Sequence, residues 1–125
     1  MRSAIGRVRG LGSAKQGTHH WWNQRLTAGA NLLLMLWFVF VLARMPAYDY
    51  ATAHATFHSA WRAIPLLMLI GSVVYHFRLG LQVVIEDYQH DESRVVAMVL
   101  LNLYAAAIFA IAAFSILKIA FGAAA

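Results

Sequence analysis

The chain has 125 residues, of which 62% are hydrophobic and only 12% are charged, whereas an average soluble domain has about 25% charged residues. A chain this short cannot hide so much apolar surface in one core, so we expect an integral membrane protein. The formal charge of +5 does not indicate nucleic-acid binding, because five of the ten basic residues lie in the first 25 positions and point to membrane topology. The absence of cysteine excludes disulfides, iron–sulfur ligation and thiol catalysis by this chain.

Residues 1–25 contain no acidic residue and are basic, as transit peptides are in composition. A secretory signal is not expected, because no short apolar region with a small-residue cleavage site follows Met1. We interpret residues 1–25 as a retained cytoplasmic N-terminal segment.

Three apolar stretches then reach the length of about 20 residues that a helix needs to cross a bilayer. We expect spans at about 26–45, 63–85 and 95–118, within one anchor domain over residues 26–122. Aromatic residues stand where the membrane interfaces should lie, as is typical of membrane proteins: Trp21, Trp22, Tyr48, Tyr50, Trp61 and Tyr88. The predicted fold class is all-α, an integral membrane bundle of three transmembrane helices.

The distribution of basic residues predicts the orientation. Six basic residues lie in the N-terminal segment and in the loop between the second and third spans, against three on the opposite side. Because cytoplasmic loops carry an excess of Lys and Arg, we expect the N-terminus in the cytoplasm and the C-terminus outside. The Glu86–Glu92 cluster and the His19–Arg25 segment then share the cytoplasmic side.

The second span is interrupted by His76, at a depth where ionisable side chains are costly and usually face a bundle interior or a cofactor. Asp87 follows eleven residues later, so the two lie on one helix face, about 16 Å apart along the axis. Gly80 lies on the same stripe and leaves room for a flat ligand. A mid-membrane ligand and a polar site at the membrane edge suit a haem and a quinone.

His76 and the Asp87–Tyr88 pair each have a plainer alternative. Neutral imidazole is a good axial ligand for haem iron, but a histidine can also be a hydrogen-bonded packing residue between helices. A second histidine ligand would have to come from a partner chain. The Tyr88 hydroxyl could donate to a quinone carbonyl, with Asp87 orienting it or relaying protons; the alternative is an interfacial tyrosine beside a solvated acid.

Three other basic residues could meet an anionic group on the cytoplasmic side. Arg78 lies roughly 11 Å from that edge, where it could snorkel or pair with a haem propionate. Arg25, near His19, could clamp a carboxylate or propionate, or it could be an interfacial anchor beside Trp21 and Trp22.

His54 and His58 are four residues apart and could share one helical face. Two histidines at this spacing can bind a metal. No acid or cysteine completes a ligand set, so we do not predict a metal site there.

Two segments resemble one known family, the small D-type cytochrome b anchor subunit of succinate dehydrogenase (respiratory complex II). One is the His-x3-Gly-x6-Asp-Tyr run formed by His76, Gly80, Asp87 and Tyr88, and the other is the stretch Thr18–Ala28 before the first span. The resemblance covers roughly residues 10–120. Arg78 is not part of the general family pattern, and His20 stands where some relatives have an acidic residue.

The resemblance implies that His76 is an axial ligand of haem b and that Tyr88, beside Asp87, donates to ubiquinone. It places Arg25 and His19 near the haem propionates and the quinone pocket. It also implies three partners: a C-type anchor that supplies the other haem ligand, an iron–sulfur subunit and a flavoprotein subunit that oxidises succinate.

We therefore expect a heterodimeric anchor bundle in a bacterial inner membrane, with a mitochondrial inner membrane less favoured. The chain would be part of an enzyme without being catalytic alone, would share haem b and ubiquinone, and would bind no nucleic acid. One alternative is the anchor of a related fumarate reductase. Another, from a different class, is a small transporter or scaffold without redox chemistry.

Overall fold

The computed structural model describes residues 3–10 and 16–122, and all regular structure in these ranges is helical. A short helix, α1 (Ala4–Val8), precedes four others: α2 (Gly17–Ala43), α3 (Tyr50–Phe57), α4 (Ala60–Tyr88) and α5 (Asp91–Phe121). Three of them, α2, α4 and α5, are long and apolar enough to cross a membrane. The predicted all-α fold with three membrane-spanning helices is confirmed.

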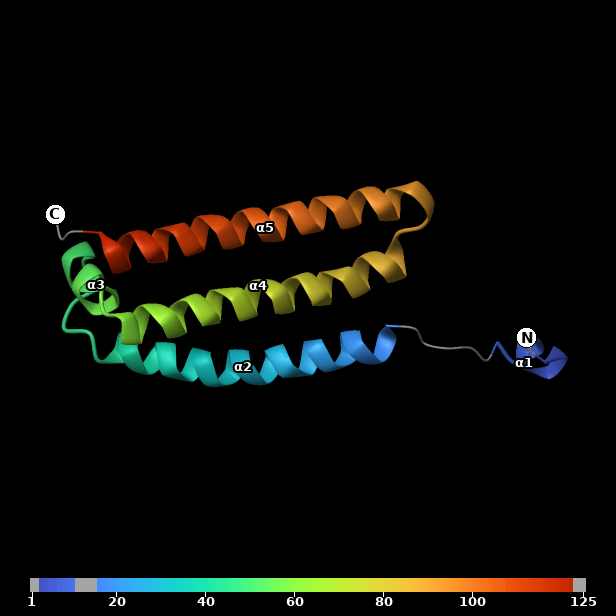
Figure 1. The fold of residues 1–125 in the computed structure, drawn as a ribbon, viewed down its shortest axis with the longest axis horizontal. Helices are drawn as coiled ribbons and strands as arrows, with labels where there is room; N and C mark the ends of the chain where they lie inside the picture. Colours follow the sequence, from blue (N-terminus) through green and yellow to red (C-terminus); the bar gives the residue numbers. More distant parts are fainter. Residues whose placement is uncertain (1–2, 11–15, 123–125) are drawn as a thin grey trace.

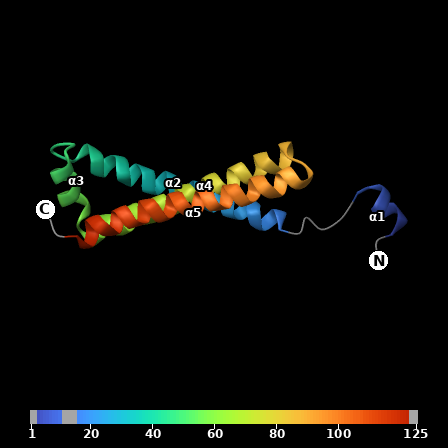
Figure 2. The ribbon, with the colours of Figure 1, turned by 90° about the horizontal axis from the view of Figure 1, so that it is seen from above.

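The three long helices lie side by side in one layer, with α4 in the middle (Figure 1). They cross at shallow angles when the layer is seen from above (Figure 2). Helix α4 packs against both α2 and α5, whereas α2 and α5 make no contact with each other within the described residues. The short helix α3 packs across one end of the layer, against α4 and α5.

A single layer of helices has two open faces and little core. Its buried apolar side chains lie along the two seams and under α3, and they are few: Phe57, Ala63, Leu69, Leu79, Leu101, Ala105 and Ile116. Most other large apolar side chains are exposed, including Leu33 at 70% and Phe114 at 70%. Exposed apolar patches of this extent mark surfaces that lipid or partner proteins cover, so both faces are suited to a bilayer and to neighbouring subunits.

The helix ends differ from the predicted spans. Helix α2 begins at Gly17, so the polar segment from His19 to Arg25 is helical and continuous with the first span. The predicted boundary at residue 25 therefore falls within a helix. Hydropathy marks where the apolar stretch begins, whereas a membrane helix can extend past the bilayer as long as its residues have adequate helix propensity.

The connection between α4 and α5 is short and directly follows the predicted Asp87–Tyr88 pair. Helix α4 ends at Tyr88, Gln89 and His90 form the turn, and Asp91 begins α5 with a left-handed φ of 54°. The acidic residues Asp91 and Glu92 occupy the first turn of α5, where negative charge interacts favourably with the helix dipole. The start of α2 lies at the same end of the layer as this turn (Figure 1).

Candidate functional site

His76 points from the interior of α4 to the seam with α2. Its Nδ1 lies 2.9 Å from Oγ1 of Thr27, and the pair is partly buried. Thr27 Oγ1 also lies 2.7 Å from the backbone carbonyl oxygen of Asn23 and 3.1 Å from that of Gln24. The ring of His76 is thus fixed at one nitrogen, while Nε2 makes no hydrogen bond within the described residues.

The surface of α2 that faces α4 is polar along its N-terminal half. His20, Gln24, Thr27 and Asn31 are spaced four, three and four residues apart, so they form one stripe along the helix. Ser72 Oγ on α4 lies 3.4 Å from the backbone carbonyl oxygen of Thr27. Three atoms of this stripe are buried without a hydrogen-bond partner in the described structure: His20 Nε2, Gln24 Oε1 and Asn31 Oδ1.

Gly80 lies on the same seam, one turn after His76. A Cβ atom added there would meet Gln24 Nε2 at 3.5 Å, an ordinary van der Waals contact. The space left by the missing side chain is therefore directed at α2.

Asn23 and Tyr75 form a second cross-helix contact between α2 and α4. Asn23 Nδ2 donates to the Tyr75 hydroxyl oxygen over 3.3 Å. This contact and the Thr27–His76 bond together fix the rotation of α2 against α4 at the level of the histidine.

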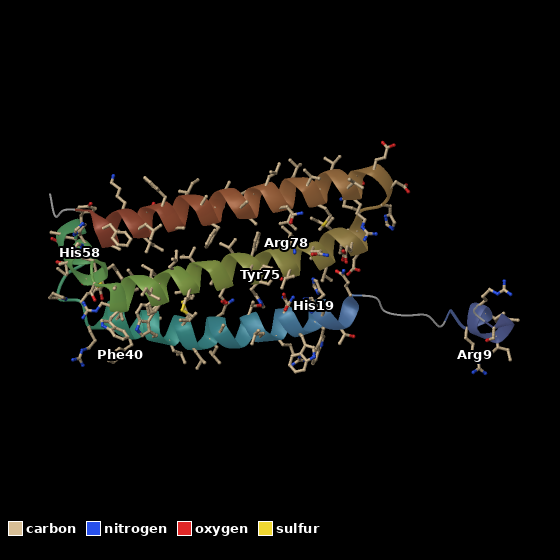
Figure 3. The ribbon with its side chains drawn as sticks, in the orientation of Figure 1. Arg9, His19, Phe40, His58, Tyr75 and Arg78 are labelled. Carbon is tan, nitrogen blue, oxygen red and sulfur yellow. The ribbon has the colours of Figure 1, made fainter. Side chains whose placement is uncertain are left out.

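Arg78 is directed at α5 instead of α2 (Figure 3). Its Nε donates to Oδ1 of Asn102 over 2.7 Å. The side chain is half-buried and lines a cavity of about 400 Å³ between α4 and α5, together with Gly71 and Phe109. Neither sequence-based interpretation of Arg78, snorkelling or propionate binding, included this contact.

The other predicted site residues gather at the end of the layer that contains the α4–α5 turn. Asp87 and Tyr88 are exposed in the last turn of α4, with Tyr88 at 77%. His19 is exposed in the first turn of α2, and the Arg25 guanidinium lies 4.6 Å from the ring centre of Trp21. No hydrogen bond joins Asp87 or Tyr88 to His19 or Arg25 in the described ranges. The polar groups at this end of the layer therefore remain exposed and do not form a closed pocket.

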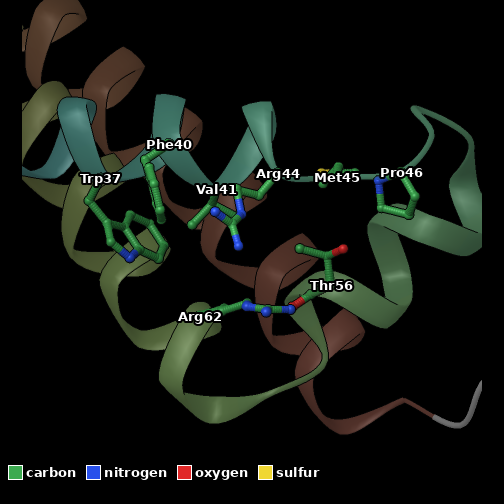
Figure 4. A pocket seen from close by; sticks show the side chains of 8 residues that line it. All are labelled: Trp37, Phe40, Val41, Arg44, Met45, Pro46, Thr56 and Arg62. Carbon is green, nitrogen blue, oxygen red and sulfur yellow. The ribbon is translucent and has the colours of Figure 1, made fainter.

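A separate cavity of about 470 Å³ lies at the opposite end, near the loop before α3 (Figure 4). It has two arginines in its lining: Arg44, stacked 5.6 Å from the ring centre of Phe40, and Arg62, which donates from Nη1 to the Thr56 carbonyl oxygen over 3.2 Å. None of the predicted haem or quinone residues lines this cavity.

The described residues contain no group of three or more His, Cys, Asp and Glu side chains that could hold a metal ion. The rings of His54 and His58 stack with centres 5.6 Å apart, and His58 Nδ1 lies 3.0 Å from the Ile119 carbonyl oxygen. This second contact links the end of α3 to α5, so the pair serves packing at this end of the bundle.

Sequence reasoning missed the polar residues that hold the site from neighbouring helices. Thr27, Asn23 and Tyr75 had no assigned role. The spacing of Thr27 from Gln24 and Asn31 is a signal that was present, because it places three polar residues on one helical face at the start of an apolar span.

The chain is similar to membrane subunits of succinate dehydrogenase and fumarate reductase. Residues 1–117 match the family described as "Succinate dehydrogenase/Fumarate reductase transmembrane subunit". The succinate dehydrogenase hydrophobic membrane anchor subunit of Rickettsia bellii is 38% identical over 87 residues, 70% of this chain and 70% of that protein. The subunit of the same name from Paracoccus denitrificans is 30% identical over 116 residues, 91% of this chain and 88% of that protein.

The succinate dehydrogenase membrane anchor subunit of Reclinomonas americana is 31% identical over 95 residues, 73% of this chain and 79% of that protein. None of the solved structures gives a significant match. With a family match that covers nearly the whole chain and three helices able to cross a membrane, this multi-pass membrane protein belongs to the succinate dehydrogenase/fumarate reductase transmembrane subunit family.

Proposed function

We propose that this chain is a membrane anchor subunit of succinate dehydrogenase, that His76 is an axial ligand of haem b, and that the ends of α2 and α4 contribute to a ubiquinone site. The matching relatives are named as succinate dehydrogenase membrane anchors. The substrate chemistry of succinate would then take place in partner subunits, a flavoprotein and an iron–sulfur protein, because this chain has no cysteine for a cluster.

The observation that carries the haem assignment is the state of the two His76 ring nitrogens. Nδ1 is held by Thr27 at 2.9 Å, and Nε2 has no hydrogen bond within the described residues. Metal-ligating histidines usually have their second ring nitrogen hydrogen-bonded in this way, which orients the ring. The residues present therefore fit the group. Bound haem would accept and release single electrons, and a second axial ligand would come from a second, C-type anchor chain.

The quinone assignment rests on the exposure of the Tyr88 and Asp87 side chains. The Tyr88 hydroxyl is accessible at the end of α4 and can donate to a carbonyl oxygen, and Asp87 lies beside it for proton exchange with solvent. His19 and Arg25 lie at the same end of the layer, where they would be near the quinone and the haem propionates. Arg78 donates from Nε to Asn102. Its terminal nitrogens would bind a propionate.

We place the N-terminus in the cytoplasm of a bacterium, because basic residues concentrate at the end that carries Asp87 and Tyr88. Succinate oxidation would then occur on the cytoplasmic side, next to the quinone site. A fumarate reductase anchor is the second candidate, because the matched family includes both enzymes. The two differ in the direction of turnover with purified partners.

Replacing His76 tests the haem assignment. In the purified complex, His76→Ala should abolish or shift the reduced haem b absorbance while succinate oxidation by a soluble dye continues. His58→Ala is the matched control, because His58 lies at the opposite end of the bundle. A haem spectrum unchanged by His76→Ala would remove His76 as a ligand.

Replacing Tyr88 tests the quinone assignment separately. Tyr88→Phe should lower ubiquinone reduction roughly 3- to 10-fold, as expected for the loss of one hydrogen bond, with dye reduction intact. Tyr50→Phe, at an exposed tyrosine of α3, is the control. Equal ubiquinone turnover in both variants would count against a direct contact.

A further inference from the structure

We propose that Thr27 is a positioning residue that fixes His76 in the tautomer able to bind iron through Nε2. The inference rests on the proposed haem function and adds to it a residue on α2. Thr27 and His76 share one contact, and the number of protons available there decides which side chain donates.

The Thr27 hydroxyl has one proton to donate. Its Oγ1 lies 2.7 Å from the Asn23 carbonyl oxygen and 3.1 Å from the Gln24 carbonyl oxygen, and a carbonyl oxygen can only accept. The shorter contact is the back-bond to residue i−4 that threonine commonly makes in helices. The hydroxyl proton is therefore used within α2.

With that proton committed, Thr27 Oγ1 can only accept from the imidazole at 2.9 Å. The donor is then the Nδ1–H group of His76. A neutral imidazole has one N–H group, so Nε2 carries a free lone pair. In the opposite tautomer Nδ1 has no proton, so Thr27 would have to turn its own proton from the Asn23 carbonyl oxygen to the imidazole. That tautomer also places a proton on Nε2, the nitrogen that has to bind iron.

The same hydrogen bond affects the electronic properties of the ligand. Donation from Nδ1–H to an acceptor raises the basicity of a ligating imidazole. A more basic ligand stabilises ferric over ferrous iron, so Thr27 lowers the midpoint potential of the haem that His76 holds.

Ser72 offers a matched control on the same seam. Its Oγ lies 3.4 Å from the backbone carbonyl oxygen of Thr27, so it borders the pair without bonding to the imidazole. Ser72→Ala removes a seam hydroxyl and leaves the Thr27–His76 bond in place. Any change in the haem that is specific to Thr27 must then come from the contact with His76.

The test uses the assembled complex carrying Thr27→Val, Thr27→Ser or Ser72→Ala. The readouts are haem content relative to flavin, the reduced absorbance spectrum and the midpoint potential. Thr27→Val keeps the volume and removes the hydroxyl, so haem should bind about 10- to 100-fold more weakly and the potential of the remaining haem should rise. Thr27→Ser and Ser72→Ala should match the wild type.

Two results would overturn the inference. One is a Thr27→Val complex with wild-type haem content and potential. The other is Thr27→Ser behaving like Thr27→Val, because the γ-methyl group would then be the feature that matters. If Thr27→Val fails to assemble, Thr27→Ala removes the same hydroxyl together with the γ-methyl group and is judged by the same criteria.

His76→Ala, measured in parallel, separates this inference from the proposed function. An unaltered haem in His76→Ala contradicts the haem assignment itself. Loss of haem in His76→Ala together with a wild-type Thr27→Val complex contradicts only the role of Thr27.

Discussion

Arg78 on α4 donates a 2.7 Å hydrogen bond from Nε to Oδ1 of Asn102 on α5. The bond supplies an acceptor to a cation that lies about 15 Å from the C-terminal end of α4, where an unpaired charge would be costly. It also fixes the rotation of α4 against α5, much as Thr27 and Asn23 fix the rotation of α4 against α2.

A double-mutant cycle on Arg78 and Asn102 should detect this bond. Arg78→Leu and Asn102→Leu should each change the stability of the chain, and the two effects should be coupled. Polar pairs between membrane helices couple by about 0.6 kcal/mol on average, with a maximum near 1.7 kcal/mol, so we expect a coupling in that range. The measurement is loss of helicity on SDS titration in mixed micelles. Additive effects of the two substitutions would mean that the bond contributes nothing.

Gly80→Ala should be tolerated. The added Cβ meets only Gln24 Nε2 at 3.5 Å, and the end of a flexible side chain can yield to it. Alanine also favours the helix by up to about 1 kcal/mol over glycine, so assembly and thermal stability should be unchanged or slightly higher. Gly80→Leu should separate α2 from α4 and lower the yield of the complex. A strong haem defect in Gly80→Ala would show that a ligand, and not Gln24, occupies the space beside Gly80.

The start of α3 should be sensitive to acid. Hydrogen bonds from the Thr52 side chain and backbone N–H, the latter at 3.2 Å, lower the pKa of the Asp49 carboxyl below its ordinary value of 3.8. Because the pKa of Asp49 is lowered in the folded state, the ionised carboxylate stabilises the helix at pH values above the unfolded pKa. This contribution is lost as the pH falls below 3.8 and through the folded pKa.

Hydrogen exchange can measure this acid sensitivity at the first amides of α3. Protection factors should be constant from about pH 6 to about pH 5 and should fall as the pH drops below 3.8 in the wild type. Asp49→Asn keeps a capping side chain that does not titrate, so its protection should vary much less over the same range. Identical pH dependence in both proteins would mean that the Asp49 carboxylate does not control this helix end.

The three membrane helices were predictable from the sequence because hydropathy over about 20 residues reports directly on the cost of crossing a bilayer. The common face of His76 and Asp87 was also predictable, because both residues belong to one helix of known period. These features depend only on local geometry and on solvent, and no partner helix is needed to derive them.

The contacts between helices could not be derived in the same way. The pairing of Thr27 with His76, and of Arg78 with Asn102, depends on the rotation and axial register of two helices. The polar stripe of α2 indicates which face is buried, but it specifies neither the partner helix nor the axial register. The helical start at Gly17 was missed for a related reason, since polar residues at a membrane edge give no hydropathy signal.

The most direct test of the central claim is affinity purification of the tagged chain from mildly solubilised membranes, with mass spectrometry and a reduced-minus-oxidised spectrum on the same sample. We predict recovery of a flavoprotein, an iron–sulfur protein and a second membrane chain with a histidine in a spanning helix, together with a haem b signal that His76→Ala removes. A chain that elutes alone or with unrelated proteins, without haem, would contradict the proposal that it anchors succinate dehydrogenase.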